Sequence, residues 1–171
     1  MTIIRFMVYV LPLVGVLINS HQASAAEFFA KAAVTYTSHS TGGNSTSATS
    51  RMIYDIGMYY KFQGAGGWCA GGIYQNEAQG GDLSANRTSY GVSGGWMTPR
   101  DSGFYLLASY FVTSTYGDFS GGNGYQADIG YKFTPRKFPL AMQFSYKNYN
   151  YSKYDHTDTY IDPYFVVMVD F

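Results

Sequence analysis

Apolar and polar residues alternate along eight segments of the chain, which are separated by clusters of Gly, Ser, Asn and Pro. In residues 125–133, YQADIGYKF, every odd position is aromatic or aliphatic, while Gln, Asp, Gly and Lys occupy the even positions. A period of two is typical of a β-strand with one apolar face, whereas a helix would scatter these charges around its circumference. The predicted strands are 28–38, 51–62, 68–76, 87–97, 103–113, 124–133, 140–149 and 160–171.

The apolar faces of these strands predict which surroundings they meet. Each strand has about 9 to 12 residues, the length that a tilted strand needs to cross the core of a bilayer. When the eight strands are oriented with their apolar faces on the same side, that side carries no Asp, Glu, Lys or Arg. In a soluble barrel this side would be sealed in the core, whereas in a membrane barrel it faces the acyl chains and the polar side faces inward.

The charged residues of the strands gather on the opposite face, where five positive charges meet five negative ones. An eight-stranded barrel is barely wide enough for its own side chains, so this face is expected to form a paired network rather than an open channel. The predicted lumen network is Lys31, Asp55, Lys61, Glu77, Arg87, Asp128, Lys132, Lys147, Asp162 and Asp170.

Aromatic residues form two groups at opposite ends of the predicted strands, as the two interfaces of a bilayer select. A soluble core gives no reason for such rings. One group is Phe28, Phe62, Trp68, Trp96, Phe104, Phe133 and Phe171, and the other is Tyr36, Tyr54, Tyr74, Tyr90, Tyr110, Tyr125 and Tyr146.

The connections between strands alternate in length. Short links are expected near 63–67, 98–102 and 134–139, and links of about ten residues at 39–50, 77–86, 114–123 and 150–159, the asymmetry of periplasmic turns and outer loops. The sequence therefore predicts an all-β fold, a closed eight-stranded antiparallel up-and-down transmembrane β-barrel with both termini on the periplasmic side. Pro163 departs from an ideal strand and predicts a bulge or an edge defect.

Composition narrows the function classes. Only 13% of the 171 residues are charged, about half the proportion of a soluble domain, and 19% are aromatic. Eleven Lys and Arg balance eleven Asp and Glu, which argues against nucleic-acid binding. The single cysteine, Cys69, excludes an intramolecular disulfide, and no Cys and His spacing indicates a metal site. No cofactor is expected.

The first 26 residues have the order of a secretory signal peptide. Arg5 precedes an apolar run from Phe6 to Ile18, and small residues at 23–26 follow it. The run is too short to span a bilayer. The predicted organisation is a cleaved signal peptide at 1–26 and a barrel at 27–171, and the alternative is an uncleaved membrane anchor.

The chain resembles the small outer-membrane barrel families, such as the transmembrane domain of outer membrane protein A and outer membrane protein X. The resemblance covers residues 27–171 and rests on strand number, strand phase and the alternating apolar ending Phe165, Val167, Val169 and Phe171. It implies that this ending is the C-terminal signal read by the barrel assembly machinery. It also implies location in the bacterial outer membrane, with outer-membrane lipids and a second envelope protein as candidate partners.

Strand pairing predicts two local sites. If Trp68 faces Trp96, then Glu77 faces Arg87 in the lumen. The same register places three small residues, Ala70, Gly72 and Gly94, on the outer face, where they are expected to leave a notch for an acyl chain or a partner's side chain. The alternative is that the glycines only relieve strand curvature. In the preceding hairpin, a register in which the numbers of paired residues sum to 130 places Cys69 opposite Lys61 near the inner end.

Few residues of the predicted barrel are suited to catalysis. Both histidines of the barrel, His39 and His156, are expected in outer loops. They could meet at the rim with Ser38, Asp155 and Asp158. A Ser, His and Asp grouping could act on lipid headgroups, as in a lipid A acylase or deacylase. The favoured prediction has no catalytic residues: a structural or surface-interaction barrel, with a rim enzyme and a narrow pore as alternatives.

Overall fold

The fold is taken from a computed structural model, which describes residues 28–41, 47–62, 67–80, 85–98, 102–133 and 140–170. All eight predicted strands are present within these ranges. Their bounds are β1 Phe28–Thr41, β2 Ser47–Lys61, β3 Trp68–Gly80, β4 Asn86–Met97, β5 Gly103–Tyr116, β6 Phe119–Phe133, β7 Leu140–Tyr151 and β8 His156–Asp170. One turn of 3-10 helix, η1 Ser152–Tyr154, precedes β8.

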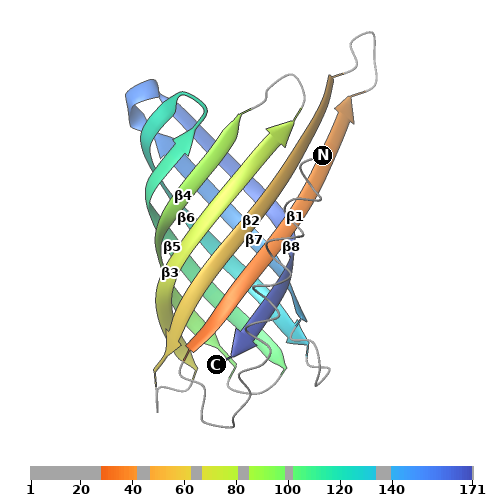
Figure 1. The fold of residues 1–171 in the computed structure, drawn as a ribbon, viewed down its shortest axis with the longest axis vertical. Helices are drawn as coiled ribbons and strands as arrows, with labels where there is room; N and C mark the ends of the chain where they lie inside the picture. The colour runs from red at the N-terminus through yellow and green to blue at the C-terminus, as the bar shows by residue number, and fades with distance from the viewer. Residues whose placement is uncertain are drawn as a thin grey trace.

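The strands form one closed barrel in the order of the chain (Figure 1). Every neighbouring pair is antiparallel, and β1 closes the barrel against β8. Phe29 pairs with Asp170, so β1 begins and β8 ends at the same end, which is drawn at the bottom of Figure 1 and is called the lower end below. The predicted all-β, antiparallel, up-and-down barrel is therefore confirmed. No helix in the described ranges is long and apolar enough to cross a membrane.

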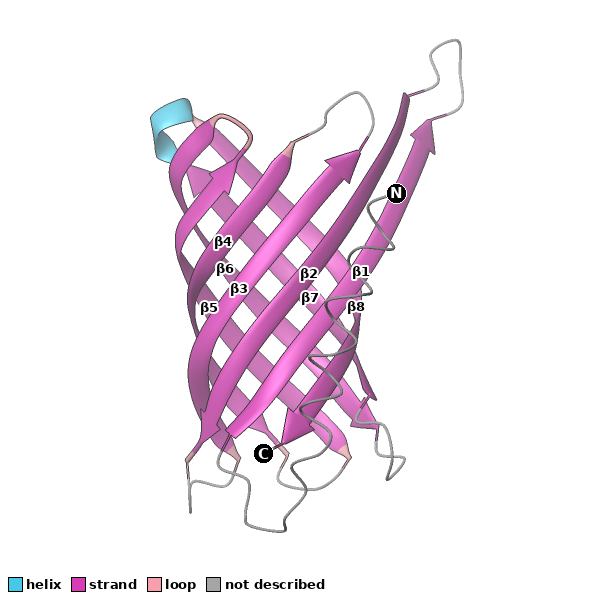
Figure 2. Cartoon of the chain, viewed as in Figure 1, coloured by secondary structure: helices cyan, strands magenta, loops and turns pink. Residues whose placement is uncertain are grey.

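The upper ends of the strands extend further than the sequence predicted, which corrects the expected outer loops. The stretch 114–123 is nearly all strand: β5 reaches Tyr116, β6 begins at Phe119, and two residues join them (Figure 2). Gly117, at φ 55°, supplies the positive dihedral that such a tight hairpin requires. The Ser and Gly content of 114–123 suggests a loop, but β-branched Thr115 fits a strand, and register shifts near Ser114 absorb the irregularity.

One seam of the barrel is shorter than the others. β1 pairs with β2 from Phe28 to Thr41, whereas its pairing with β8 runs only from Phe29 to Val34. Both strands continue upward beyond this point, and Figure 1 shows their upper ends on opposite sides of the view. Within the described residues, the upper parts of β1 and β8 therefore form a split.

Pro163 lies at this split. Its pairing with Phe144 of β7 is continuous with the pairs on either side, so the predicted bulge is wrong. The ladder with β1 ends at Phe165, two residues away. The alternative prediction, an edge position, agrees with the structure. Pro163 has no N–H group to donate, and it is tolerated here because β8 has no β1 partner at this level in the described residues.

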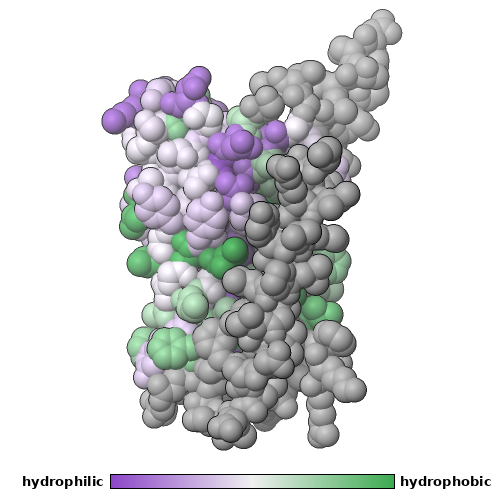
Figure 3. All heavy atoms as spheres, viewed as in Figure 1, coloured by the Kyte–Doolittle hydropathy of each residue, from purple (hydrophilic) through white to green (hydrophobic). Residues whose placement is uncertain are grey.

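The two faces of the sheet differ as predicted. Large apolar and aromatic side chains point outward and are exposed, while the charged and amide side chains of the strands point mainly into the barrel. In Figure 3 hydrophilic residues lie toward the upper end of the visible face, with hydrophobic residues below them. Described members of both aromatic groups are among the exposed side chains: Phe28, Phe62, Trp68, Phe104 and Phe133 at lower ends, and Tyr36, Tyr74, Tyr90, Tyr110, Tyr125 and Tyr146 higher up.

Large tyrosines fit inside this narrow barrel because glycines lie beneath them. Tyr105 pairs with Gly130, and a Cβ atom at Gly130 would lie 2.2 Å from the Tyr105 ring. Tyr149 covers Gly124 in the same way. Both tyrosines are fully buried. The core of the molecule is therefore the lumen, filled by aromatic rings and by polar side chains.

Candidate functional site

The polar lumen holds two clusters of ionised side chains, one above the other. The lower cluster is centred on Lys31, whose Nζ donates to Asp128 Oδ2 at 2.9 Å and to Gln143 Oε1 at 3.1 Å. Gln126 Nε2 donates to the other Asp128 oxygen, at 2.8 Å, and to Asp55 Oδ2 at 3.1 Å. Gln75 Nε2 donates to Asp55 Oδ1 at 2.7 Å. Amide side chains thus bridge the two carboxylates.

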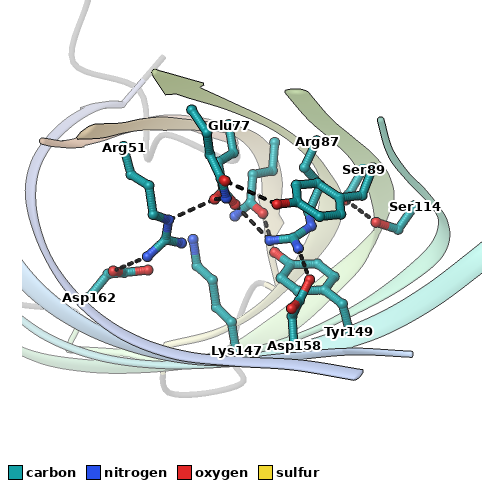
Figure 4. A network of polar contacts seen from close by, with 12 residues as sticks. Arg51, Glu77, Arg87, Ser89, Ser114, Lys147, Tyr149, Asp158 and Asp162 are labelled. Carbon is teal, nitrogen blue, oxygen red and sulfur yellow. Dashed lines mark hydrogen bonds and ion pairs between the residues drawn. The ribbon is translucent and has the colours of Figure 1, made fainter. Parts of the chain in front are cut away.

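The upper cluster is centred on Glu77 of β3, which lies between two guanidinium groups (Figure 4). Its Oε1 accepts from Arg51 Nε at 2.7 Å and from Gln79 Nε2 at 2.7 Å. Its Oε2 accepts from Arg87 Nη1 at 2.7 Å. Charge-assisted bonds of this kind are the strong class, and two cations compensate the charge of one buried carboxylate.

Arg87 of β4 is enclosed on every side. Its remaining donors go to Asp158 and, at 3.0 Å, to the Tyr151 hydroxyl. The guanidinium carbon lies 4.3 Å from the ring centre of Tyr149 and 4.6 Å from that of Tyr116. These hydrogen bonds and ring contacts compensate the buried charge of the guanidinium group. The Arg87 side chain and the rings around it fill the upper lumen.

Arg51 of β2 reaches past β1 to β8. Besides Glu77, it donates from Nη1 to Asp162 Oδ1 at 3.2 Å, and its guanidinium carbon lies 3.8 Å from the ring centre of Tyr160. The side chain is 18% exposed, unlike that of Arg87, which is fully buried. Arg51 therefore belongs to the lumen network at its least enclosed point.

Lys147 of β7 connects the two clusters. Its Nζ lies 3.9 Å from Asp55 of the lower cluster and donates to the Tyr164 hydroxyl. In Figure 4 its side chain extends toward the Arg51 guanidinium and Glu77. The lumen network therefore spans seven of the strands named above through Lys31, Arg51, Glu77, Arg87, Asp128, Lys147 and Asp162.

Three predicted lumen residues lie at the lower mouth rather than in the interior. Lys61 Nζ lies 2.5 Å from Asp170 Oδ1, with both side chains partly exposed. Lys132 is also partly exposed. By the alternation of the sequence these residues belong to the inward-facing set. They are nevertheless reached by water because they lie at the end of the barrel.

The strand registers inferred from residue sums are correct. Trp68 pairs with Trp96, Glu77 pairs with Arg87, and Lys61 pairs with Cys69. Cys69 is buried on the inner face. Once the phase of two strands is known, one anchored pair determines every other pair of that hairpin.

Sequence analysis missed Arg51 and the part that Asp158 plays in the network. Arg51 has the same parity as Ile53 and Asp55, which face inward, so the alternation alone could have found it. Asp158 falls in a stretch expected to be loop, and its contact with Arg87 depends on how far β8 extends upward. The bridging amides Gln75, Gln126 and Gln143 carry no charge and were overlooked for that reason.

The predicted notch residues lie together on the outer face. Ala70 pairs with Gly94, and Gly72 pairs with Val92. A Cβ atom at Gly72 would meet only the Gly91 carbonyl oxygen, at 3.9 Å, so the surface there is open. At Gly94 a Cβ atom would lie 3.1 Å from the Cys69 carbonyl oxygen, so close strand approach explains this glycine.

The two histidines lie in strands rather than in loops, which corrects the prediction. His39 pairs with Thr49 in β1, but its side chain and that of Ser38 lie outside the described residues. His156 begins β8, lies 3.0 Å from Asp158 Oδ1 and packs beside the rings of Tyr116 and Phe119. Of the predicted Ser, His and Asp grouping, the described side chains bring together His156 and Asp158.

The remaining predicted positions are placed as follows. Phe165 is 70% exposed and points outward, with Val167 and Val169 on the same face, while Phe171 lies outside the described residues. The signal peptide predicted for 1–26 also lies outside them. Within the described ranges, no three His, Cys, Asp or Glu side chains gather as a metal site.

No family model matches the chain, and comparisons with curated proteins and with solved structures find no match. The resemblance to the small outer-membrane barrels therefore rests on architecture alone.

Proposed function

We propose that the chain is an integral outer-membrane β-barrel with a filled polar lumen and a structural or surface-interaction role. Its outer face carries this proposal. Ile129 lies between Tyr125 and Phe133 along β6 and pairs with Leu106 and Phe144, and all three are more than half exposed. The charged side chains of the same strands point inward or lie at the mouths. Monomeric soluble proteins rarely expose apolar patches larger than a few hundred Å², so hydrocarbon is the surrounding that such a belt fits.

The lumen supports a role other than conduction. Arg87, Glu77 and Lys147 are buried side chains that cross the interior, and Tyr105 and Tyr149 fill the space between the walls. Opening a path through these groups would leave charges unpaired at low dielectric, which is strongly unfavourable. A narrow pore is therefore the weaker alternative.

A lipid-modifying enzyme at the upper rim is the other alternative. Asp158 contacts both His156, at 3.0 Å, and Arg87 of the lumen network. Because this carboxylate is shared with the lumen network, a structural role for it is favoured over a catalytic one. We propose that interaction with lipids and with a second envelope protein takes place on the outer face, and that the barrel assembly machinery inserts the chain through its ending at 165–171 with both termini periplasmic.

Membrane insertion can be tested in a Gram-negative host that expresses the full chain. The protein is expected in the outer-membrane fraction. After unfolding in urea, it should refold to a form with shifted gel mobility only when detergent micelles or lipid vesicles are present. A folded, water-soluble monomer without any amphiphile would contradict the proposal.

A pair of variants sharpens this test. Ile129→Lys places a charge in the middle of the outer belt and should cost about 2–4 kcal/mol of folding free energy in vesicles. Ser152→Lys adds the same charge to the exposed turn η1 and should fold as the parent does. Equal folding of both variants would exclude a lipid-facing belt at Ile129.

A further inference from the structure

The split between β1 and β8 is bridged by side chains where backbone pairs end. Beyond Val34, β1 continues to Thr41 paired only with β2 in the described residues. Thr37, the partner of Arg51, lies three residues above Val34, about 10 Å further along the strand. The Arg51 side chain leaves β2 at this level, passes the inner side of β1 and meets Asp162 and Tyr160 of β8.

This bridge leaves polar atoms unmatched. Among the described residues, three buried side-chain atoms lack a well-directed hydrogen bond within the protein, namely Arg51 Nη2, Asp162 Oδ2 and His156 Nε2. All three belong to β2 or β8 beside the split, and His156 Nε2 lies 3.0 Å from the Asp158 carboxylate. A buried donor or acceptor without a partner destabilises the closed state, and water would satisfy both Arg51 and Asp162 on opening.

We propose that the upper part of the β1–β8 seam is a lateral gate and that Arg51 is its latch. In the closed state Arg51 ties β2, and with it the β1–β2 hairpin, to Asp162 and Tyr160. In the open state this hairpin moves away from β8, the backbone ladder below Val34 stays intact, and the upper lumen is open to the side. Two such states can interconvert because, in the described part of the chain, no backbone pairs join β1 to β8 above Val34.

The gate leads to the buried amine of Lys147, which pairs with Tyr160, one of the two β8 residues that Arg51 contacts. This side chain is 1% exposed and is held by Asp55 and Tyr164. Directly below the split, Ala32, Val34 and Phe165 line an apolar hollow of about 420 Å³. An open gate would join this hollow to the polar lumen, a path that suits an amphiphile with a polar head and an apolar chain.

Lysine acetylation measures the opening on the folded protein in detergent micelles. A water-soluble N-hydroxysuccinimide ester of acetic acid is the probe, and the labelling rate of each lysine is divided by its rate in the urea-unfolded chain. Lys147 is expected to label at least ten times faster than Lys31, which is equally buried but lies where β1 and β8 are fully paired. Equal protection of the two lysines would overturn the proposal.

Variants test the latch itself. Arg51→Gln and Asp162→Asn should each raise Lys147 labelling a further tenfold or more and leave Lys31 unchanged. Asp128→Asn is the matched control, because it neutralises a buried, ion-paired aspartate of the lower cluster, and it should not raise Lys147 labelling. If Asp128→Asn and Asp162→Asn raise it equally, the lumen loosens as a whole and there is no gate. Should the variants fail to fold, the parent comparison of Lys147 with Lys31 still decides.

Failure of the gate is distinct from failure of the proposed function. A chain that inserts into membranes but protects both lysines equally retains its membrane location and loses only the gate.

Discussion

The lower and upper halves of the lumen hold similar charges in different surroundings. In the lower half Lys31, Asp128 and Asp55 are fully buried, and amide side chains fill their remaining hydrogen-bonding positions. In the upper half Glu77 and Arg87 are equally well paired, but Arg51 and Asp162, beside the split, each leave a polar atom unmatched. The lower cluster lies within continuous ladders on all sides, whereas the upper one lies where a ladder has ended.

The difference shows that backbone pairing decides what a buried ion pair does in this barrel. Where the walls are continuous, an ion pair satisfies groups that cannot reach water. Where backbone hydrogen bonds between two strands are missing, an ion pair helps to hold the strands together. The strength of that ion pair then determines how stable the closed seam is. Substitutions in the two halves should therefore differ in size and in how local their effects are.

Lys31→Met should have the largest effect, because it leaves Asp128 buried and uncompensated. The expected loss is about 3–5 kcal/mol of unfolding free energy, measured by urea titration in lipid vesicles. The double variant Lys31→Met with Asp128→Leu should recover most of this loss. If the double variant is no more stable than the single one, burial of the unpaired charge is not the cause.

Gly130→Val tests the packing that accompanies the lower cluster. The added side chain would collide with the ring of Tyr105, so about 1–3 kcal/mol of stability should be lost. Gly72→Val is the matched control on the outer face, where the space is open, and it should change the unfolding midpoint little. Equal losses would show that strand curvature, rather than lumen space, requires both glycines.

Arg51→Gln should cost less than Lys31→Met, about 1–2 kcal/mol, because Arg51 is partly exposed and Glu77 keeps Arg87. Hydrogen exchange followed by mass spectrometry should show faster exchange in the upper parts of β1 and β2, while β3 and β4 keep their protection. Uniformly faster exchange would remove the distinction between the seam and the other walls.

Lys61→Gln at the lower mouth should have the smallest effect, below about 1 kcal/mol, since its contact with Asp170 is partly exposed. High salt should reduce the difference between this variant and the parent, because ions screen an exposed pair. An effect as large as that of Lys31→Met would mean that the mouth is as enclosed as the lumen.

Much of the fold was predictable because its pattern is local. The alternation in 125–133 assigns each residue to a face without knowledge of any other strand, and the pair Trp68 and Trp96 determines the whole β3–β4 register. The upper ends were harder. The Ser, Thr and Gly residues near Tyr116 and Phe119 serve in loops and in twisted strand ends alike, so composition could not place the turn.

The candidate site was predicted in part for the same reason. Glu77 and Arg87 are neighbours across one hairpin, and their contact follows from register. The contacts of Arg51 with Asp162 and of Arg87 with Asp158 join residues far apart in sequence across the lumen. Neither contact follows from any hairpin, because it depends on the tilt and closure of the barrel.

The strands, their inward and outward faces and the register within hairpins follow from the amino-acid pattern alone, since period-two alternation and cross-strand pairing act between near neighbours. The folded barrel sets where β1 parts from β8, which side chains meet across the lumen, and which described polar atoms remain unmatched there. These features arise when a sheet closes on itself, and closure brings together residues that no local pattern relates.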